Sequence, residues 1–186
     1  MKLYIKNMVC SRCIMVVESE LKKFGLHPVL VELGTASLLE NLQKDQEQQL
    51  NIKLMALGFE IIDDKKSRVV EKVKNIITDL VYFNDNQLTT NLSDYIVASI
   101  GQDYSHISNV FSQQENTTIE QYHILQKIER VKELLVYDEL TLNEISFLLH
   151  YSSPSHLSKQ FKKVTGITPT SFKNSKEQKR LLIENL

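Results

Sequence analysis

The sequence predicts an α+β protein in which a small unit with the element order βαββαβ precedes an all-helical part. Two observations predict this organisation. Short apolar runs alternate with turn residues up to residue 64, and apolar residues at helical spacing dominate the rest of the chain. A charge run at 63–66 separates the two patterns. We therefore expect domains at 1–64 and 69–186, joined by a linker at 65–68.

The first part is predicted to alternate strands and helices. Leu3 and Ile5 indicate a strand, and Gly25 is expected to stop the helix that follows it. The predicted elements are a strand near 3–9, a helix over about 11–24, a hairpin of strands at 29–33 and 37–40, a helix over about 45–57 and a strand at 59–62.

The helical part contains two similar segments. Comparing each position with the one 50 residues later aligns 105–108 (SHIS) with 155–158 (SHLS), and Phe111 with Phe161. Such matches indicate duplication. An amphipathic helix precedes them, marked by Val70, Val73, Ile77 and Leu80. We predict two related helical segments, separated by a second amphipathic helix with Glu, Lys and Arg on its other faces. That helix is marked by Ile124, Ile128, Val131 and Leu135.

The second segment carries the clearer signals for helix ends. Thr141 and Glu144 have the spacing of a capping box. Ser153 can cap the next helix with Pro154 in the first helical position, and Gly166 is placed to end it. These signals predict a helix, a short turn and a helix.

Charge is distributed unevenly along the chain. The formal net charge is only −1, but residues 151–186 hold seven Lys/Arg and two Asp/Glu, whereas residues 67–150 hold six and twelve. Residues 75–126 contain no Lys or Arg. Because phosphate affinity is provided by Lys and Arg, the C-terminal end is the part suited to bind nucleic acid.

The last helix of the second segment has a polar outer face. Leu157, Phe161 and Val164 form its predicted buried stripe. Hydrogen-bonding groups near its start and cations beyond them suit a helix that reads DNA, although they also suit a solvated surface helix. The candidate DNA-binding residues are Ser155, His156, Ser158, Lys159, Gln160, Lys162 and Lys163.

The run HLSKQFKK at 156–163 and the pattern GxTPxxF at 166–172 strongly resemble the DNA-binding domain of the AraC/XylS transcription regulators. The resemblance covers about residues 70–173. It implies two helix-turn-helix units, at about 91–115 and about 141–165, joined by a long linker helix at about 122–136. Their recognition helices would enter successive major grooves, one duplex turn or roughly 34 Å apart. It also implies base contacts by Ser155, His156 and Lys159, and phosphate contacts by Lys162 and Lys163.

The first unit departs from this pattern. In place of Lys159, Lys162 and Lys163 it has Asn109, Ser112 and Gln113. We therefore expect the second unit to anchor double-stranded DNA and the first to add little affinity. The alternative is that the acidic first unit docks on another protein. Its weak DNA-binding candidates are Ser105, His106, Ser108 and Asn109.

Two cysteines form a CxxC motif where the first strand gives way to the first helix. A helix N-terminus and the cation of Arg12 favour thiolate, so lowered thiol pKa values are expected at Cys10 and Cys13. Two soft thiolates can hold Cu(I) in near-linear coordination. With no third cysteine in the chain, a closed zinc site within one chain is not expected.

The pattern MxCxxC at 8–13, the βαββαβ order and LGFE at 57–60 resemble the heavy-metal-associated domain of copper chaperones and metal-pumping ATPases. The resemblance implies a ferredoxin-like fold over residues 1–64. It departs from the family at Asn7, where a glycine is usual, and at the bulky Arg12. Three roles stay open: soft-metal binding, a redox dithiol, or a retained fold that pairs protomers or binds an organic effector.

No motif of an enzyme stands out, since the chain has no Gly-rich phosphate loop, HExxH or GxSxG. No apolar run approaches the roughly 18 residues of a membrane helix, and we expect a cytoplasmic protein with no membrane partner. The sequence thus predicts a transcription regulator with an N-terminal sensor or dimerisation module. The alternative is a Cu(I)-handling protein whose helical half is a docking module.

Overall fold

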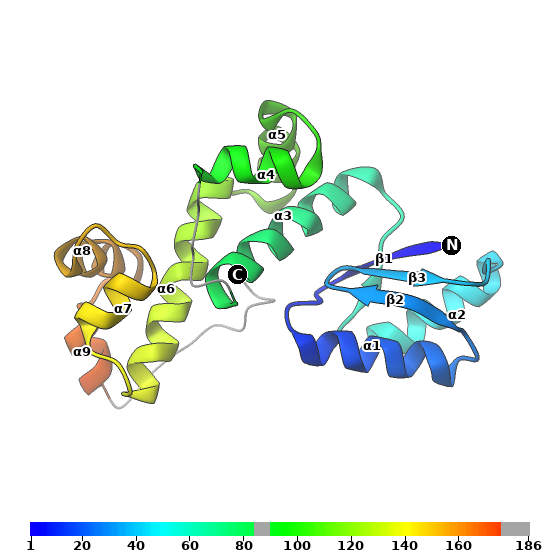
Figure 1. The fold of residues 1–186 in the computed structure, drawn as a ribbon, viewed down its shortest axis with the longest axis horizontal. Coiled ribbons are helices and arrows are strands. Elements are labelled where there is room, and N and C mark those ends of the chain that lie inside the picture. The colour runs from blue at the N-terminus through cyan, green and yellow to red at the C-terminus, as the bar shows by residue number, and fades with distance from the viewer. Residues whose placement is uncertain (84–89, 176–186) are drawn as a thin grey trace.

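The computed structural model describes residues 1–83 and 90–175, in which an α/β unit precedes a set of helices (Figure 1). This arrangement agrees with the predicted α+β class. The charges of Asp85, Lys176, Lys179 and Arg180, and the C-terminal end of the predicted domain 69–186, lie outside the described residues. Among the helices that the structure describes, none has the length and apolar character needed to cross a membrane.

The α/β unit is one antiparallel sheet of four strands with two helices on one face. The strand order is β2-β3-β1-β4, and in the central strand β1 Leu3 pairs with Ala36 and Ile5 with Ile61. Alternation turns Leu3 and Ile5 to the same side, where they are buried against α1 and α2. The elements are β1 (Lys2–Lys6), α1 (Ser11–Lys23), β2 (Pro28–Glu32), β3 (Thr35–Leu38), α2 (Lys44–Met55) and β4 (Glu60–Ile61).

The helical part is organised around one long helix, α6. It packs against α3 and α5 on one side and against α7, α8 and α9 on the other, which creates two hydrophobic cores. The elements are α3 (Lys65–Tyr82), α4 (Leu92–Ile100), α5 (Tyr104–Glu115), α6 (Ile119–Tyr137), α7 (Leu142–Leu148), α8 (Pro154–Thr165) and α9 (Pro169–Asn174).

The offset of 50 residues also relates the ends of the helices. The same offset joins the N-caps of α4 and α7, of α5 and α8, and of α6 and α9, which are Asn91 and Thr141, Asp103 and Ser153, and Thr118 and Thr168. It joins the left-handed C-caps of α5 and α8 as well, where Asn116 has φ 54° and Gly166 has φ 82°. The two segments are therefore related in backbone as well as in side chains.

An aromatic pair is repeated in the two cores. Phe111 of α5 meets Tyr122 of α6 edge-on with 5.6 Å between ring centroids, and Phe161 of α8 meets Phe172 of α9 in the same way at 5.6 Å. The start of α6 thus closes the first core as α9 closes the second. Helix α9 was not among the predicted elements, although Thr168 followed by Pro169 is the same start signal as Ser153 followed by Pro154.

The predicted linker at 65–68 is wrong, because these residues form the first turn of α3. The carboxylate of Asp64 accepts hydrogen bonds from the backbone N–H of Ser67 at 2.8 Å and from its hydroxyl at 3.0 Å. Aspartate is a preferred N-cap residue because its carboxylate accepts backbone N–H groups of the first turn. In the sequence, Asp64 lies within the charge run at 63–66, which favoured a linker over a helix start.

Three charged residues of α6 are buried. Lys127, Glu129 and Lys132 are all less than a tenth exposed. Lys132 pairs with Glu129 along the helix, and the Lys127 ammonium lies 4.0 Å from the centroid of the Tyr151 ring. Burial lowers the pKa of Lys127 to about 8. These positions are covered because α6 has neighbours on both sides.

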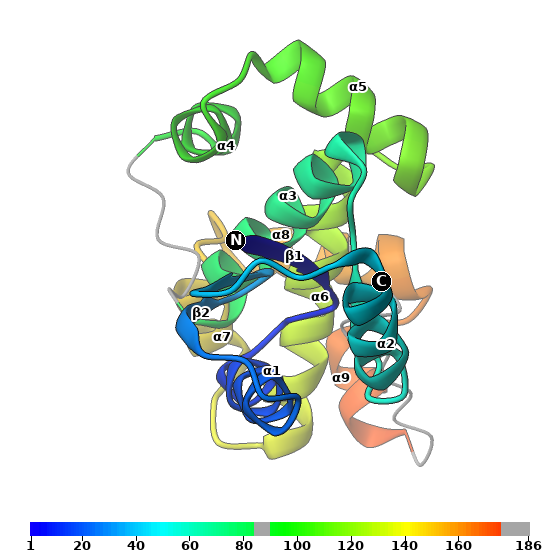
Figure 2. The same cartoon turned by 90° about the vertical axis from the view of Figure 1, so that its right-hand side faces the viewer.

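The α/β unit meets the helical part through α3. In Figure 2, α1 and α2 lie below the sheet and α3 lies above it. The Arg68 guanidinium lies 4.2 Å from the centroid of the Tyr4 ring, and the backbone N–H of Asn7 donates to Glu71 Oε2 at 3.4 Å. Gly34 has φ 79°, and a Cβ there would lie 2.3 Å from Asn75 Nδ2. The face of the sheet opposite α1 and α2 is therefore closely approached by α3.

Candidate nucleic-acid interface

Helix α8 is fixed at both ends by the residues that the sequence singled out. The hydroxyl of Ser153 accepts a hydrogen bond from the backbone N–H of His156 at 3.1 Å, and Pro154 occupies the first turn. Gly166 ends the helix in the left-handed conformation, with φ 82°. In the preceding helix α7, Thr141 and Glu144 form the predicted capping box. The turn between α7 and α8 is therefore defined by local hydrogen bonds.

The two faces of α8 differ in chemistry. Leu157 and Phe161 have no exposed surface and lie in the core with α6 and α9. Their burial leaves the opposite face outside. Most of the candidate residues are exposed, namely Ser155, His156, Lys159, Lys162 and Lys163, while Ser158 and Gln160 are half-buried.

Tyr151, in the turn before α8, orders two of the candidate side chains. Its hydroxyl donates to Gln160 Oε1 at 2.7 Å, and its ring meets the His156 ring edge-on with 5.6 Å between centroids. His156 Nδ1 also lies 3.0 Å from the hydroxyl of Ser152. Burial raises the pKa of the Tyr151 phenol, so it stays a neutral donor. His156 is thus held in an exposed orientation, whereas Gln160 is occupied within the protein.

The cations of α8 lie where they favour binding of an anion. Lys162 and Lys163 are in the last turn, and Lys159 is one turn earlier on the exposed face. In the part of the chain that the structure describes, no carboxylate pairs with any of the three. Their charges are therefore not neutralised locally and remain available to phosphate groups.

Helix α5, the equivalent of α8 in the first unit, presents a different surface. Its N-cap is the carboxylate of Asp103, which accepts hydrogen bonds from the N–H of Ser105 at 2.9 Å and from the Ser105 hydroxyl. These bonds lower the pKa of Asp103 and keep it charged. Asn109 Oδ1 accepts a hydrogen bond from Gln113 Nε2 at 3.2 Å. Two candidate side chains of the first unit therefore already have partners in the helix.

Further acidic groups surround α5. The Tyr104 hydroxyl donates to Glu120, and Glu115 forms an ion pair with Lys74 of α3 at 2.7 Å. The hydrogen bond from Tyr104 lowers the pKa of Glu120, so this carboxylate is ionised at neutral pH. Anions are therefore repelled from the start of α5 more than from α8.

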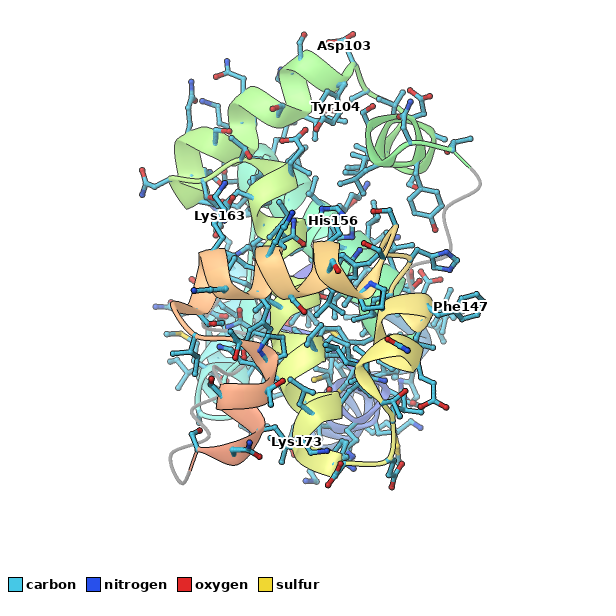
Figure 3. All side chains as sticks on the ribbon, turned by 90° about the vertical axis from the view of Figure 1, so that its left-hand side faces the viewer. Asp103, Tyr104, Phe147, His156, Lys163 and Lys173 are labelled. Carbon is cyan, nitrogen blue, oxygen red and sulfur yellow. The ribbon has the colours of Figure 1, made fainter. Side chains whose placement is uncertain are left out.

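The two helices have the same general direction. Figure 3 shows α5 above α8, with Asp103 and Tyr104 at the N-terminal end of α5 on the side where α8 also begins. In the same view, His156 lies near the start of α8 and Lys163 lies nearer its end. Of the first-unit candidates, Ser105, His106 and Asn109 are exposed and Ser108 is half-buried. His106 also lines a cavity near α3 and the sheet, together with Lys65 and Lys66.

The basic residues at the start of α3 were missing from the candidates taken from the sequence. Lys65, Arg68 and Lys72 are spaced by three and four residues, which places them on one face of a helix. This spacing is visible in the sequence, but the predicted linker at 65–68 places the first two of these residues outside a helix.

The two cysteines lie close together at the start of α1. Cys10 Sγ is 3.3 Å from Cys13 Sγ, and both side chains are half-buried. The expected lowering of the thiol pKa is wrong for Cys13, because burial and the neighbouring thiol raise it. Among the described residues, no group of three or more His, Cys, Asp or Glu could hold a metal ion.

Asn7 has the left-handed conformation, with φ 68°. Asparagine tolerates this region better than most residues other than glycine, so the sequence departure at Asn7 does not prevent the turn. Its side-chain amide donates to the carbonyl of Gly58 at 2.9 Å. The turn that leads into Cys10 and α1 is therefore tied to the segment that follows α2.

Comparisons with known proteins agree with this geometry. A family model described as a helix-turn-helix domain matches residues 96–175. The chain is 23% identical over 164 residues to an uncharacterized HTH-type transcriptional regulator of Staphylococcus aureus (strain MSSA476), covering 81% of this chain and 21% of that protein. It is 21% identical over 140 residues to the xylose operon regulatory protein of Escherichia coli (strain K12), covering 75% of this chain and 36% of that protein.

A solved structure shares the fold of a large part of the chain. The C-terminal domain of AraT, a response regulator from Geobacillus stearothermophilus, matches 64% of this chain and 92% of its own chain with a TM-score of 0.51 and 19% identity. The chain spans about a fifth to a third of the curated relatives named above. From α4 to α9, the caps, the paired cores and the family match agree. Residues 96–175 thus match a helix-turn-helix domain, in which α4–α5 and α7–α8 are the two helix pairs.

Proposed function

We propose that the protein is a sequence-specific, DNA-binding transcription regulator that acts in the cytoplasm and anchors on double-stranded DNA through α8. The observation that carries this proposal is the exposed face of α8, on which Ser155, His156 and Lys159 lie opposite a stripe with no exposed surface. Hydroxyl, imidazole and ammonium groups can bond base edges in the major groove. Lys162 and Lys163, near the end of the helix, are assigned to phosphates.

The first unit has a secondary role in this proposal. Its helix α5 has Asn109, Ser112 and Gln113 where α8 has three lysines, and its N-cap is a carboxylate. It enters the neighbouring groove, about one turn or roughly 34 Å away, with neutral contacts only. The affinity of the protein for DNA therefore depends chiefly on α8.

Selection from a pool of random duplexes tests the proposal. We expect the full chain to enrich one motif and to bind it much more tightly than a scrambled duplex of the same composition. Lys159→Ala should lower the affinity for the selected duplex and relax its preference at one position. Equal binding of selected and scrambled duplexes by the wild type would contradict a sequence-specific regulator.

We propose that residues 1–64 form a ferredoxin-like domain, similar to heavy-metal-associated domains, that serves as a sensor or pairs two protomers. The strand order β2-β3-β1-β4 and the two helices on one face support this fold. A soft metal ion such as Cu(I) would be held by Cys10 and Cys13, whose sulfur atoms are 3.3 Å apart. This pair also favours the second candidate function, a Cu(I)-handling protein whose helical half docks on another protein.

Titration of the reduced chain with Cu(I) against a competing chelator tests the metal assignment. The wild type should retain one ion that the double variant Cys10→Ser, Cys13→Ser loses, and identical behaviour of the two would remove the assignment. Sedimentation of both proteins shows whether they form homodimers. Metal binding without duplex selectivity would favour the second candidate function.

A further inference from the structure

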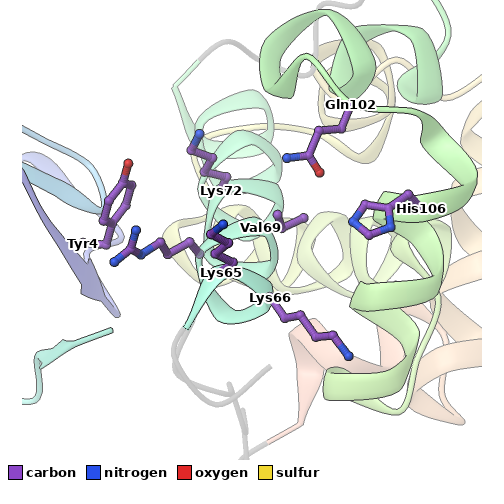
Figure 4. A pocket seen from close by; sticks show the side chains of 8 residues that line it. Tyr4, Lys65, Lys66, Val69, Lys72, Gln102 and His106 are labelled. Carbon is purple, nitrogen blue, oxygen red and sulfur yellow. The ribbon is translucent and has the colours of Figure 1, made fainter. Parts of the chain in front are cut away.

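A cavity of about 380 Å³ lies where the sheet meets α3 and the start of α5. Figure 4 shows its lining, with Tyr4 on one side, lysines of α3 in the middle and His106 and Gln102 on the other side. We call it the basic cavity. It is lined by Tyr4, Lys65, Lys66, Arg68, Val69, Lys72, Gln102 and His106.

The lining of the basic cavity is strongly cationic. Four of its eight residues are Lys or Arg, all from the first two turns of α3, and none of the eight is acidic. Elsewhere in the helical part, residues 75–126 hold no Lys or Arg. The basic cavity therefore gathers positive charge at a place where the α/β unit, α3 and α5 meet.

The carboxylates near the cavity are engaged with other groups. Asp63 pairs with the Arg68 guanidinium at 2.7 Å, and Asp64 accepts from Ser67 as the cap of α3. Asp103 accepts from Ser105 as the cap of α5. Of the cavity's four Lys and Arg residues, Arg68 alone has an ion-pair partner among the described residues. The ammonium groups of the three lysines therefore remain available.

We propose that the basic cavity binds a small, multiply charged phosphate compound. Ammonium groups attract phosphate oxygens as point charges, and three lysines line the cavity together with Arg68. The amide of Gln102 and the imidazole of His106 supply further polar contacts from the α4–α5 turn and α5. The Tyr4 ring, already stacked with Arg68, offers an aromatic wall to the organic part of the ligand.

Such a ligand would connect the two parts of the protein. It would contact β1, α3 and α5 together and so bias the position of the first helix-turn-helix unit relative to the sheet. An effect on DNA binding follows only if the ligand binds the free and DNA-bound forms with different affinities. That regulatory effect rests on the proposed function, whereas phosphate binding itself does not.

Calorimetric titration of the full chain with pyrophosphate, without DNA, tests the proposal. Lys66→Gln and Lys72→Gln should each weaken binding by about tenfold, because each removes one charge-assisted contact. Lys72→Arg should restore most of it. Lys44→Gln, which removes the same charge at an exposed site on α2, should bind as the wild type does.

Two results would overturn the proposal: no pyrophosphate binding by the wild type, or equal binding by Lys66→Gln, Lys72→Gln and Lys44→Gln. A duplex-binding assay in phosphate-free buffer separates the two sources of phosphate. If Lys66→Gln and Lys72→Gln weaken duplex binding as much as Lys162→Gln, the cavity contacts the DNA backbone and the small-ligand assignment fails. If the wild type binds pyrophosphate as expected but no duplex, the proposed function fails and the phosphate site stands.

Discussion

Lys159 and Asn109 occupy equivalent positions on α8 and α5, and both are exposed. If Lys159 donates to a base edge, Lys159→Ala should cost about 1–3 kcal/mol of binding free energy for the preferred duplex. Asn109→Ala is the matched control, and its loss should be much smaller because α5 lies among carboxylates. Titration of a fluorescent duplex measures both, and equal losses would contradict the proposed asymmetry.

His123, half-buried on α6, makes stability depend on pH. Burial, together with the nearby Lys127 cation, lowers the pKa of His123 from 6.5 to about 4. Between these values the unfolded chain binds a proton that the folded chain does not, so stability falls as the pH drops from 6.5 towards 4. The loss is at most about 3 kcal/mol. Urea unfolding should show a flatter pH dependence for His123→Gln, and parallel curves would exclude His123 as the cause.

At the scale of single elements, the capping box of α7 offers a direct test of local structure. The Thr141 hydroxyl accepts from the N–H of Glu144 at 3.3 Å, and the Glu144 carboxylate accepts from the N–H of Thr141 at 2.7 Å. Thr141→Ala should lower the free energy of unfolding by about 1 kcal/mol. Thr170→Ala, at an exposed site in α9, should change it little, and similar losses in the two variants would show that the cap contributes nothing.

Elements whose signals are local could be predicted from the sequence. Ser153, Pro154 and Gly166 lie at the ends of α8 because a hydroxyl cap, a proline and a left-handed glycine act within one turn. The burial of Lys127 and Glu129 could not be predicted in this way. It depends on which helices pack around α6, and a single sequence does not state those contacts.

The candidate site was likewise predictable where it depends on local spacing and not where it depends on contacts between elements. The spacing of Leu157 and Phe161 was enough to place five candidates on the exposed face of α8. The half-burial of Gln160 depends on Tyr151, whose hydroxyl reaches it across the turn. The basic cavity could not be predicted, because it depends on how the sheet packs against α3. The sequence shows only that Lys65, Arg68 and Lys72 share one face of a helix.

At the scale of the whole molecule, a substitution at Gly34 tests the contact between the sheet and α3. Gly34→Ala and the control Gly25→Ala both place a Cβ on a backbone with positive φ, 79° and 83°. Each should cost about 1–2 kcal/mol for that reason. Only the Cβ at position 34 meets a neighbour, Asn75 Nδ2 at 2.3 Å, whereas position 25 faces open space.

Gly34→Ala should therefore speed hydrogen exchange at the start of α3 more than Gly25→Ala does, because Asn75 must move aside. Removing the obstructing amide with Asn75→Ala in the Gly34→Ala background should reverse this extra effect. Equal exchange rates in the two glycine variants would show that the sheet and α3 do not pack at this point.

The salt dependence of duplex binding tests most directly whether α8 provides the anchoring charges. The slope of log affinity against log salt counts the phosphates that cations neutralise. Lys162→Gln and Lys163→Gln should each reduce the magnitude of this slope by about 1, while the equivalent changes on α5, Ser112→Ala and Gln113→Ala, should leave it unchanged. An unchanged slope in the lysine variants, or an equal reduction in the α5 variants, would contradict DNA anchoring by α8.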